Sequence, residues 1–179
     1  MVRLKTASVL LSLLLCTVYS SSKAQSKDIA GGISVGINIP AGSFSSTHIV
    51  GVSVGYSHRR YVFGTTGKKN LTFTYNGGFA YYFWKKETVS IYQYKYPGYI
   101  FIHGFSGAIY NPIKNGTIAL TAGPALRIYN GNTQFNIGSQ LEFNYCINNK
   151  VAIGPEIILM KELGADLLWS TALKATFSL

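Results

Sequence analysis

The segment "STALKATFSL" (170–179) alternates between two kinds of side chain along its whole length. One face consists of Thr171, Leu173, Ala175, Phe177 and Leu179, and the residues between them are small, polar or charged. Because successive side chains of a β-strand point to opposite faces of its sheet, a period of two residues is typical of a strand. The segment therefore predicts a strand with one apolar face. Another part of the protein, or lipid, must keep that face out of water.

The same alternation recurs in seven further segments. They cover residues 29–39, 48–58, 70–83, 98–110, 117–129, 133–146 and 150–160. Their β-branched and aromatic residues favour strands, and the Gly, Asn and Pro residues between them favour turns. We therefore predict eight antiparallel strands. The orientation of the segment 98–110 stays open, because both of its faces carry apolar side chains.

Residues 1–24 predict a secretory signal peptide. The basic start "MVRLK" (1–5) precedes the short apolar run "TASVLLSLLLCTVYS" (6–20), and small residues up to Ala24 fit a cleavage site. Cleavage there leaves residues 25–179 as one domain. Cys146 is then the single cysteine, so an internal disulfide is excluded.

The composition favours a membrane surface. Hydrophobic residues make up 47% of the chain and charged residues 12%, about half the share usual in soluble domains. No run after Ala24 approaches the ~20 apolar residues of a membrane-spanning helix. Basic residues outnumber acidic ones, 16 to 6. Because export argues against nucleic acid as a partner, an anionic membrane surface is the better candidate.

Three features predict a barrel that crosses a membrane. The polar faces carry mostly Gly, Ala, Ser, Thr and Asn, which suit a narrow lumen of small hydrophilic side chains. The segments have the length that a tilted strand needs to cross hydrocarbon. Aromatic residues gather at segment ends, as in the girdles of spanning barrels: Tyr56, Phe83, Trp84, Tyr110, Tyr129, Tyr145, Trp169 and Phe177. Since lipid satisfies no backbone polar group, the last strand must pair with the first and close the ring.

The pattern resembles the small eight-stranded outer-membrane β-barrels of the OmpX and OmpA-transmembrane type. The segment "VGINIPAGSFSSTHIVGVSVGY" (35–56) is similar to the first hairpin of the outer membrane protein β-barrel domain family. The resemblance implies an up-and-down transmembrane barrel in the bacterial outer membrane. It also implies contact with lipids and lipopolysaccharide, insertion by the barrel-assembly machinery, and a monomer. The chain departs from the family at Leu179, where such barrels usually end in an aromatic residue.

Two prolines conflict with regular strands. Pro124 and Pro155 fall within predicted strands on the outward face, and each follows a glycine. A closed barrel has no free edge for a residue that lacks an N–H. We therefore expect a β-bulge at each proline.

The inward faces of four consecutive segments carry charges. These residues are Arg127, Glu142, Glu156 and Lys174, with the last three at similar heights and Arg127 higher. Buried charges must be paired. We therefore predict a salt-bridge network that plugs the lumen, with a path for protons or ions as the alternative.

The histidines do not form the Ser–His pair that lipid-A-modifying barrels use. His103 and Ser106 fall on opposite strand faces, as do His58 and Ser57, and His48 lies at a loop. We therefore predict no catalysis, no cofactor and no metal site. The alternatives are a lipid-A-modifying enzyme of the deacylase type and a soluble exported barrel that binds a small apolar ligand.

Outward loops are predicted at 40–47, 84–97, 130–132 and 161–169, if the N-terminus is periplasmic. They carry Lys85, Lys86, Lys95 and Lys161. We expect these lysines to meet lipopolysaccharide phosphates, with an ordinary solvated loop as the alternative. The Tyr-rich segment 84–97 is also predicted to protrude as a hairpin and to present an edge to a partner.

Overall fold

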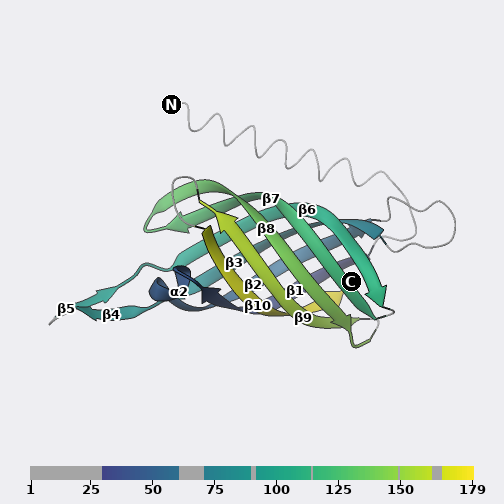
Figure 1. Ribbon diagram of the computed structural model, residues 1–179, viewed down its shortest axis with the longest axis horizontal. Coiled ribbons are helices and arrows are strands. Elements are labelled where there is room, and N and C mark those ends of the chain that lie inside the picture. The colour runs from purple at the N-terminus through teal and green to yellow at the C-terminus, as the bar shows by residue number, and fades with distance from the viewer. Residues whose placement is uncertain (1–29, 61–70, 90–91, 114, 149, 163–166) are drawn as a thin grey trace, which may run out of the picture.

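The computed structural model describes residues 30–60, 71–89, 92–113, 115–148, 150–162 and 167–179, so the predicted signal peptide lies outside the described residues. The main body is a closed antiparallel barrel (Figure 1). Its strands are β1 (Ala30–Ala41), β2 (His48–Arg60), β3 (Leu71–Trp84), β6 (Tyr99–Ile113), β7 (Gly116–Tyr129), β8 (Asn132–Cys146), β9 (Val151–Lys161) and β10 (Leu167–Ser178). The eight predicted strands are confirmed.

The closing strand is the one that the C-terminal alternation predicted. β10 pairs with β1, from Trp169 opposite Ala41 to Ser178 opposite Gly32. Every other barrel strand pairs with its neighbours in the chain, and β3 pairs with β6 across the segment between them. The closed ring leaves no free sheet edge in the barrel, as a strand structure in lipid requires.

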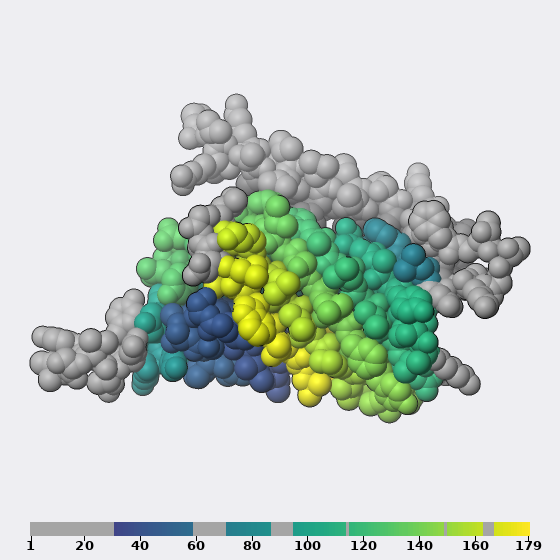
Figure 2. Space-filling view, in the orientation of Figure 1, coloured from purple at the N-terminus to yellow at the C-terminus, as the bar shows by residue number. Residues whose placement is uncertain are grey.

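Large apolar side chains cover the outside of the barrel. Val52, Phe73 and Leu173 are 47%, 42% and 62% exposed, whereas Thr72 is buried in the lumen. Figure 2 shows part of this outer surface, over β1, β9 and β10. A soluble barrel has the reverse polarity, with its apolar side chains packed at the centre. Tyr129 was predicted as one of the girdle aromatic residues at the strand ends, but it packs against the buried hydrophobic cluster inside the barrel.

β6 is the strand whose orientation the sequence left open. Tyr99, Phe101, Phe105 and Ile109 are buried inside the barrel, and Tyr110 faces outward. The lumen is therefore partly aromatic, which corrects the expectation of small hydrophilic side chains throughout. The reason is that small residues on facing strands make room for large ones. A Cβ at Gly138 of β8, for example, would lie 2.6 Å from Cζ of Phe105.

Neither proline lies at a β-bulge, so that prediction is wrong. Pro124 and Pro155 face outward, and the pairing register is the same on both sides of each proline. The ladder instead omits two residue pairs beside each proline and then resumes. The glycine before Pro155 lets the neighbouring strand β8 approach closely. A Cβ at Gly154 would overlap the carbonyl oxygen of Phe143.

The remaining elements lie in the connections at one end of the barrel, the end that the sequence analysis assigned to the outward loops. The first turn contains the four-residue helix α2 (Phe44–Thr47), which the sequence did not predict. Between β3 and β6, β4 (Lys86–Val89) and β5 (Tyr92–Lys95) form the predicted hairpin, which protrudes beyond the barrel (Figure 1). The tight β7–β8 turn holds Asn130 and Gly131 at φ 50° and 74°, a conformation that favours Asn and Gly. The C-terminus lies at the other end of the barrel (Figure 1).

Candidate functional site

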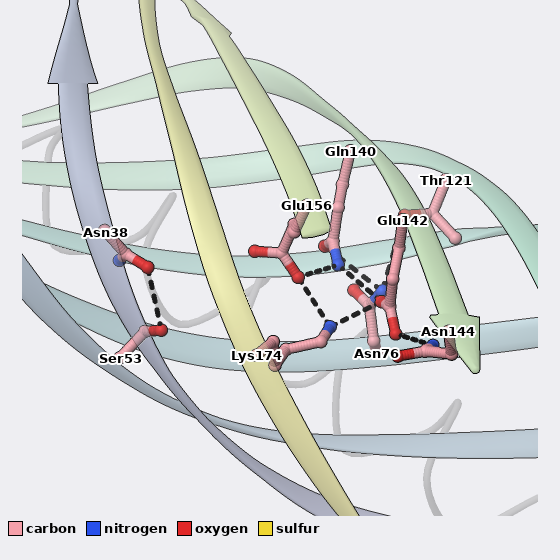
Figure 3. A network of polar contacts seen from close by, with 9 residues as sticks. All are labelled: Asn38, Ser53, Asn76, Thr121, Gln140, Glu142, Asn144, Glu156 and Lys174. Carbon is pink, nitrogen blue, oxygen red and sulfur yellow. Dashed lines mark hydrogen bonds and ion pairs between the residues drawn. The ribbon is translucent and has the colours of Figure 1, made fainter. Parts of the chain in front are cut away.

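The barrel interior contains a cluster of three charged side chains from three adjacent strands. Nζ of Lys174, on β10, lies 2.5 Å from Oε2 of Glu156 on β9, and it also forms an ion pair with Oε2 of Glu142 on β8. The Lys174 side chain is 10% exposed and both carboxylates are similarly buried. Figure 3 shows the ammonium group between the two carboxylates. Three of the four charges expected in the lumen therefore meet.

Amide side chains complete the hydrogen bonding of this cluster. Nε2 of Gln140 donates to Oε2 of both glutamates, at 2.9 Å to Glu142 and 2.8 Å to Glu156. Nδ2 of Asn144 donates to the other oxygen of Glu142. Nδ2 of Asn76, from β3 across the lumen, donates to Oε1 of Gln140 at 3.2 Å. The network thus joins strands from opposite walls, and the alternation pattern gave no signal that singled out these amides.

Arg127 lies apart from the other three charges. Its guanidinium is 2.5 Å from Oε2 of Glu162 and also donates to Oε1 of Gln134. The hydroxyl of Tyr99 donates to Oε1 of Glu162 at 3.1 Å. Glu162 follows the last residue of β9, where the sequence predicted an outward loop, so no strand parity marked it as inward. Among the described side chains of the lumen, the charges therefore form two separate clusters.

Aromatic rings fill the outward half of the lumen. Helix α2 places the buried Phe44 in the barrel mouth, with its ring centroid 4.8 Å from that of Tyr82 and 4.9 Å from that of Tyr99. His48 links two outward connections, since its Nε2 lies 3.1 Å from the carbonyl oxygen of Pro97 and its Nδ1 lies 2.8 Å from Oγ1 of Thr47. These contacts cover the lumen from the outward side.

Two cavities among the described residues of the barrel are small. One cavity of about 20 Å³ is lined by polar groups that include Ser53, His103, Gln140 and Lys174, and another of about 10 Å³ lies among the aromatic rings. A cavity needs roughly 10–15 Å³ of such volume to hold one water molecule. These spaces therefore suit single waters.

No hydrogen bond joins a histidine to a serine in the part of the chain that the structure describes. His103 lies in the lumen between Phe101 and Phe105, and Ser106 is exposed on the other face of β6. His58 contacts the hydroxyl of Tyr56 at 3.3 Å and the ring of Tyr75. Within the described residues, no group of three or more His, Cys, Asp or Glu side chains is placed to hold a metal ion.

The structure divides the four outward lysines into two groups. Lys86 and Lys95 are cross-strand partners at the base of the β4–β5 hairpin, and Lys85 precedes them directly. Nζ of Lys95 lies 3.7 Å from the ring centroid of Trp84. Lys161 ends β9, and three strands separate β9 from β3 in either direction around the barrel. Lys161 is therefore on the opposite side.

The comparisons with known proteins agree with the geometry. No protein-family model matches the chain, and no curated protein matches it by sequence. The crystal structure of the outer membrane enzyme PagL matches with a TM-score of 0.61 at 13% identity, covering 82% of this chain and 98% of PagL. The outer membrane protein Ail of Yersinia pestis, in a phospholipid bilayer nanodisc, matches with a TM-score of 0.53 at 10% identity, covering 84% and 99%.

The chain therefore has the fold of the small eight-stranded outer-membrane β-barrels. This confirms the predicted fold class. At these identities the likeness defines the fold, and the role of the protein has to be argued from its own residues.

Proposed function

We propose that the protein is an integral protein of the bacterial outer membrane with a structural or surface-interaction role, a filled lumen and no catalytic activity. The apolar outside carries this proposal. Large apolar side chains are exposed on each of the eight barrel strands, whereas soluble monomers rarely expose contiguous apolar patches above roughly 600 Å². Lipid is the solvent that suits such a surface, because it makes burial of these side chains unnecessary.

Membrane fractionation combined with gel migration before and after heating tests the location. We expect the protein in the outer-membrane fraction, with a folded band whose migration changes on boiling. Recovery of the mature chain in the soluble periplasmic fraction would contradict the proposal and would favour the soluble exported barrel. The partners in this proposal are outer-membrane lipids, lipopolysaccharide and, during insertion, the barrel-assembly machinery. Since the closed ring has no free edge, a monomer suffices.

The competing function is a lipid-A-modifying enzyme, and the likeness to PagL is the observation that favours it. Our proposal instead rests on the surroundings of the histidines. Among the described side chains, His48 and His103 point into the lumen, away from lipid, and the hydrogen-bonding partner of the outward His58 is a tyrosine. Mass spectra of lipid A from cells with and without the protein discriminate the two functions. Identical spectra support our proposal, and loss or gain of an acyl chain would refute it.

The surface-interaction role is assigned to the basic group at the hairpin base, Lys85, Lys86 and Lys95, which we call the lysine group. Like charges directly opposite each other in a sheet are destabilising, and Lys86 faces Lys95 in this way. A bound anion would offset that repulsion. Lipopolysaccharide phosphates are the anions found at the outward end of an outer-membrane barrel, and lysines bind phosphate well.

Charge removal tests the lysine group. We expect the triple variant K85Q/K86Q/K95Q to retain less lipopolysaccharide after purification than the wild type. We expect K161Q to lose less, because Lys161 lies on the opposite side of the barrel from the lysine group. K150Q is the matched control, since Lys150 is exposed at the other end of the barrel. Equal retention by the triple variant and K150Q would show that the lysines are merely solvated.

A further inference from the structure

We propose that His48 is the positioning residue of the lysine group, because it connects the base of the β4–β5 hairpin to the segment that covers the barrel mouth. This inference rests on the proposed binding of phosphate by Lys85, Lys86 and Lys95. The hairpin forms a sheet of its own, so contacts outside the barrel ladder must hold its base in place. Ordering a flexible segment on binding costs affinity, so a base that is already fixed favours binding of an anion.

A β-bulge turns His48 into the barrel mouth. The register of β2 against β3 shifts between His48 and Gly51, where β2 has one residue more than its partner. Strict alternation from the outward Val52 would place His48 toward lipid and Ile49 toward the lumen. The structure shows the reverse, with Ile49 59% exposed and His48 3% exposed. Bulges often re-aim a side chain beside a functional site, and here the re-aimed side chain is an imidazole.

The imidazole connects one side of the hairpin base to helix α2. Nε2 of His48 lies 3.1 Å from the carbonyl oxygen of Pro97, which follows β5 by two residues. Because a carbonyl oxygen only accepts, Nε2 carries a proton and donates it. Nδ1 lies 2.8 Å from Oγ1 of Thr47, the last residue of α2, and in the neutral ring it accepts from that hydroxyl.

The other side of the hairpin base is held at the same place. The backbone N–H of Lys85 donates to the carbonyl oxygen of Thr47 at 2.9 Å, and the N–H of Tyr96 donates to the carbonyl oxygen of Lys85 at 3.4 Å. Residues 47 and 48 therefore contact both ends of the segment that carries the lysine group. Figure 1 shows α2 beside the base of the hairpin. Loss of the bond to Pro97 would leave the hairpin attached on the Lys85 side alone.

The aromatic surroundings of His48 suggest the variant that isolates its hydrogen bonds. Its ring centroid lies 4.8 Å from that of Phe44, 5.8 Å from that of Tyr99 and 6.1 Å from that of Tyr129. A phenyl ring suits such neighbours, so H48F keeps an aromatic side chain in the mouth and removes both ring nitrogens. H48Q keeps an N–H donor on a flexible side chain and is the conservative variant.

Residue-resolved hydrogen exchange of the folded protein in lipid nanodiscs, without lipopolysaccharide, tests the positioning. We expect the Lys85 and Tyr96 amides to be protected in the wild type and in H48Q. In H48F they should exchange about 2- to 10-fold faster, the effect of one net hydrogen bond. The amide of Val54, in the middle of the β2 ladder, should be unchanged. H58F is the matched control, since His58 lies at the other end of β2 and also contacts a tyrosine ring.

Lipopolysaccharide retained after purification tests the consequence. We expect H48F to retain less than the wild type, and H48Q and H58F to retain as much. Wild-type retention by H48F, where K85Q/K86Q/K95Q loses lipopolysaccharide, would overturn the inference and leave the proposed function intact. Equal retention by the triple lysine variant and K150Q would refute lipopolysaccharide binding by the lysine group, whatever the exchange rates show.

The exchange rates decide the positioning independently. A Lys85 amide that exchanges in the wild type as fast as in an unfolded peptide would overturn it, and this measurement stands even if a variant fails to fold. Unchanged exchange in folded H48F would overturn it as well. Equal acceleration in H48Q and H48F would contradict a role for the hydrogen bond to Pro97. Heat-dependent gel migration reports the folding of each variant.

Discussion

At the residue scale, Lys174 is the side chain on which the interior depends most. Its ammonium group forms ion pairs with both Glu142 and Glu156, and it comes from the strand that closes the ring. Removal of one partner from a buried ion pair leaves uncompensated charge, whereas removal of all partners together costs far less. The contribution of Lys174 to stability therefore depends on the presence of Glu142 and Glu156.

K174M is predicted to lower the free energy of unfolding by about 3–5 kcal/mol, the range for breaking a buried pair. Urea titration of the barrel in lipid vesicles, followed by gel migration, measures this change. K150M, at an exposed site, should unfold like the wild type. The triple variant K174M/E142Q/E156Q should recover most of the loss. A K174M barrel as stable as K150M would mean that the glutamates do not require the lysine.

At the element scale, the two Gly-Pro steps show how a strand accommodates proline without a bulge. Gly154 lets the backbone of β8 approach β9, and the ladder resumes in the same register beyond Pro155. The mid-strand glycines are therefore not equivalent. A Cβ at Gly104 of β6 meets no atom within 4 Å, although Gly104 also lies where the ladder omits pairs.

G154A is predicted to destabilise the barrel by about 1–3 kcal/mol, because its methyl group would force the backbone at Phe143 to move. G104A should change stability little. It serves as the control because both substitutions add one methyl group where the ladder omits residue pairs beside a proline. The same urea titration compares them. Equal stability of the two variants would contradict the close approach of β8 and β9.

At the scale of the whole molecule, two groups of side chains fill the lumen at different heights. The aromatic rings around Phe44 fill the outward half of the lumen, and the Lys174 cluster joins its walls further inside. The cavities between them have room for about one water each. Such an interior stabilises the ring, and neither of these two cavities has room for a chain of waters.

The purified protein is accordingly predicted not to conduct ions when it is reconstituted into planar lipid bilayers. Current recordings at neutral pH should show no discrete steps above those of protein-free bilayers. A porin with a wide lumen, inserted by the same procedure, verifies that the assay detects open channels. Discrete steps that scale with protein concentration would show that the interior opens and would favour the conducting path.

The sequence by itself determined the number of strands, their approximate limits and the polarity of the barrel. Alternation is a local property with a period of two residues, so Val52, Phe73 and Leu173 could be assigned to the outside without knowledge of any partner strand. The protruding hairpin followed from the length and composition of residues 84–97. The periodicity also placed Glu142, Glu156 and Lys174 on inward faces.

Only the tertiary structure decided which side chains meet. β6 has two apolar faces, so its orientation depends on the space that small residues such as Gly138 leave on another strand. Arg127 pairs with Glu162 and not with Glu142, because the relative register of the strands sets the height of each side chain in the lumen. That register joins residues far apart in the chain, and no local periodicity encodes it.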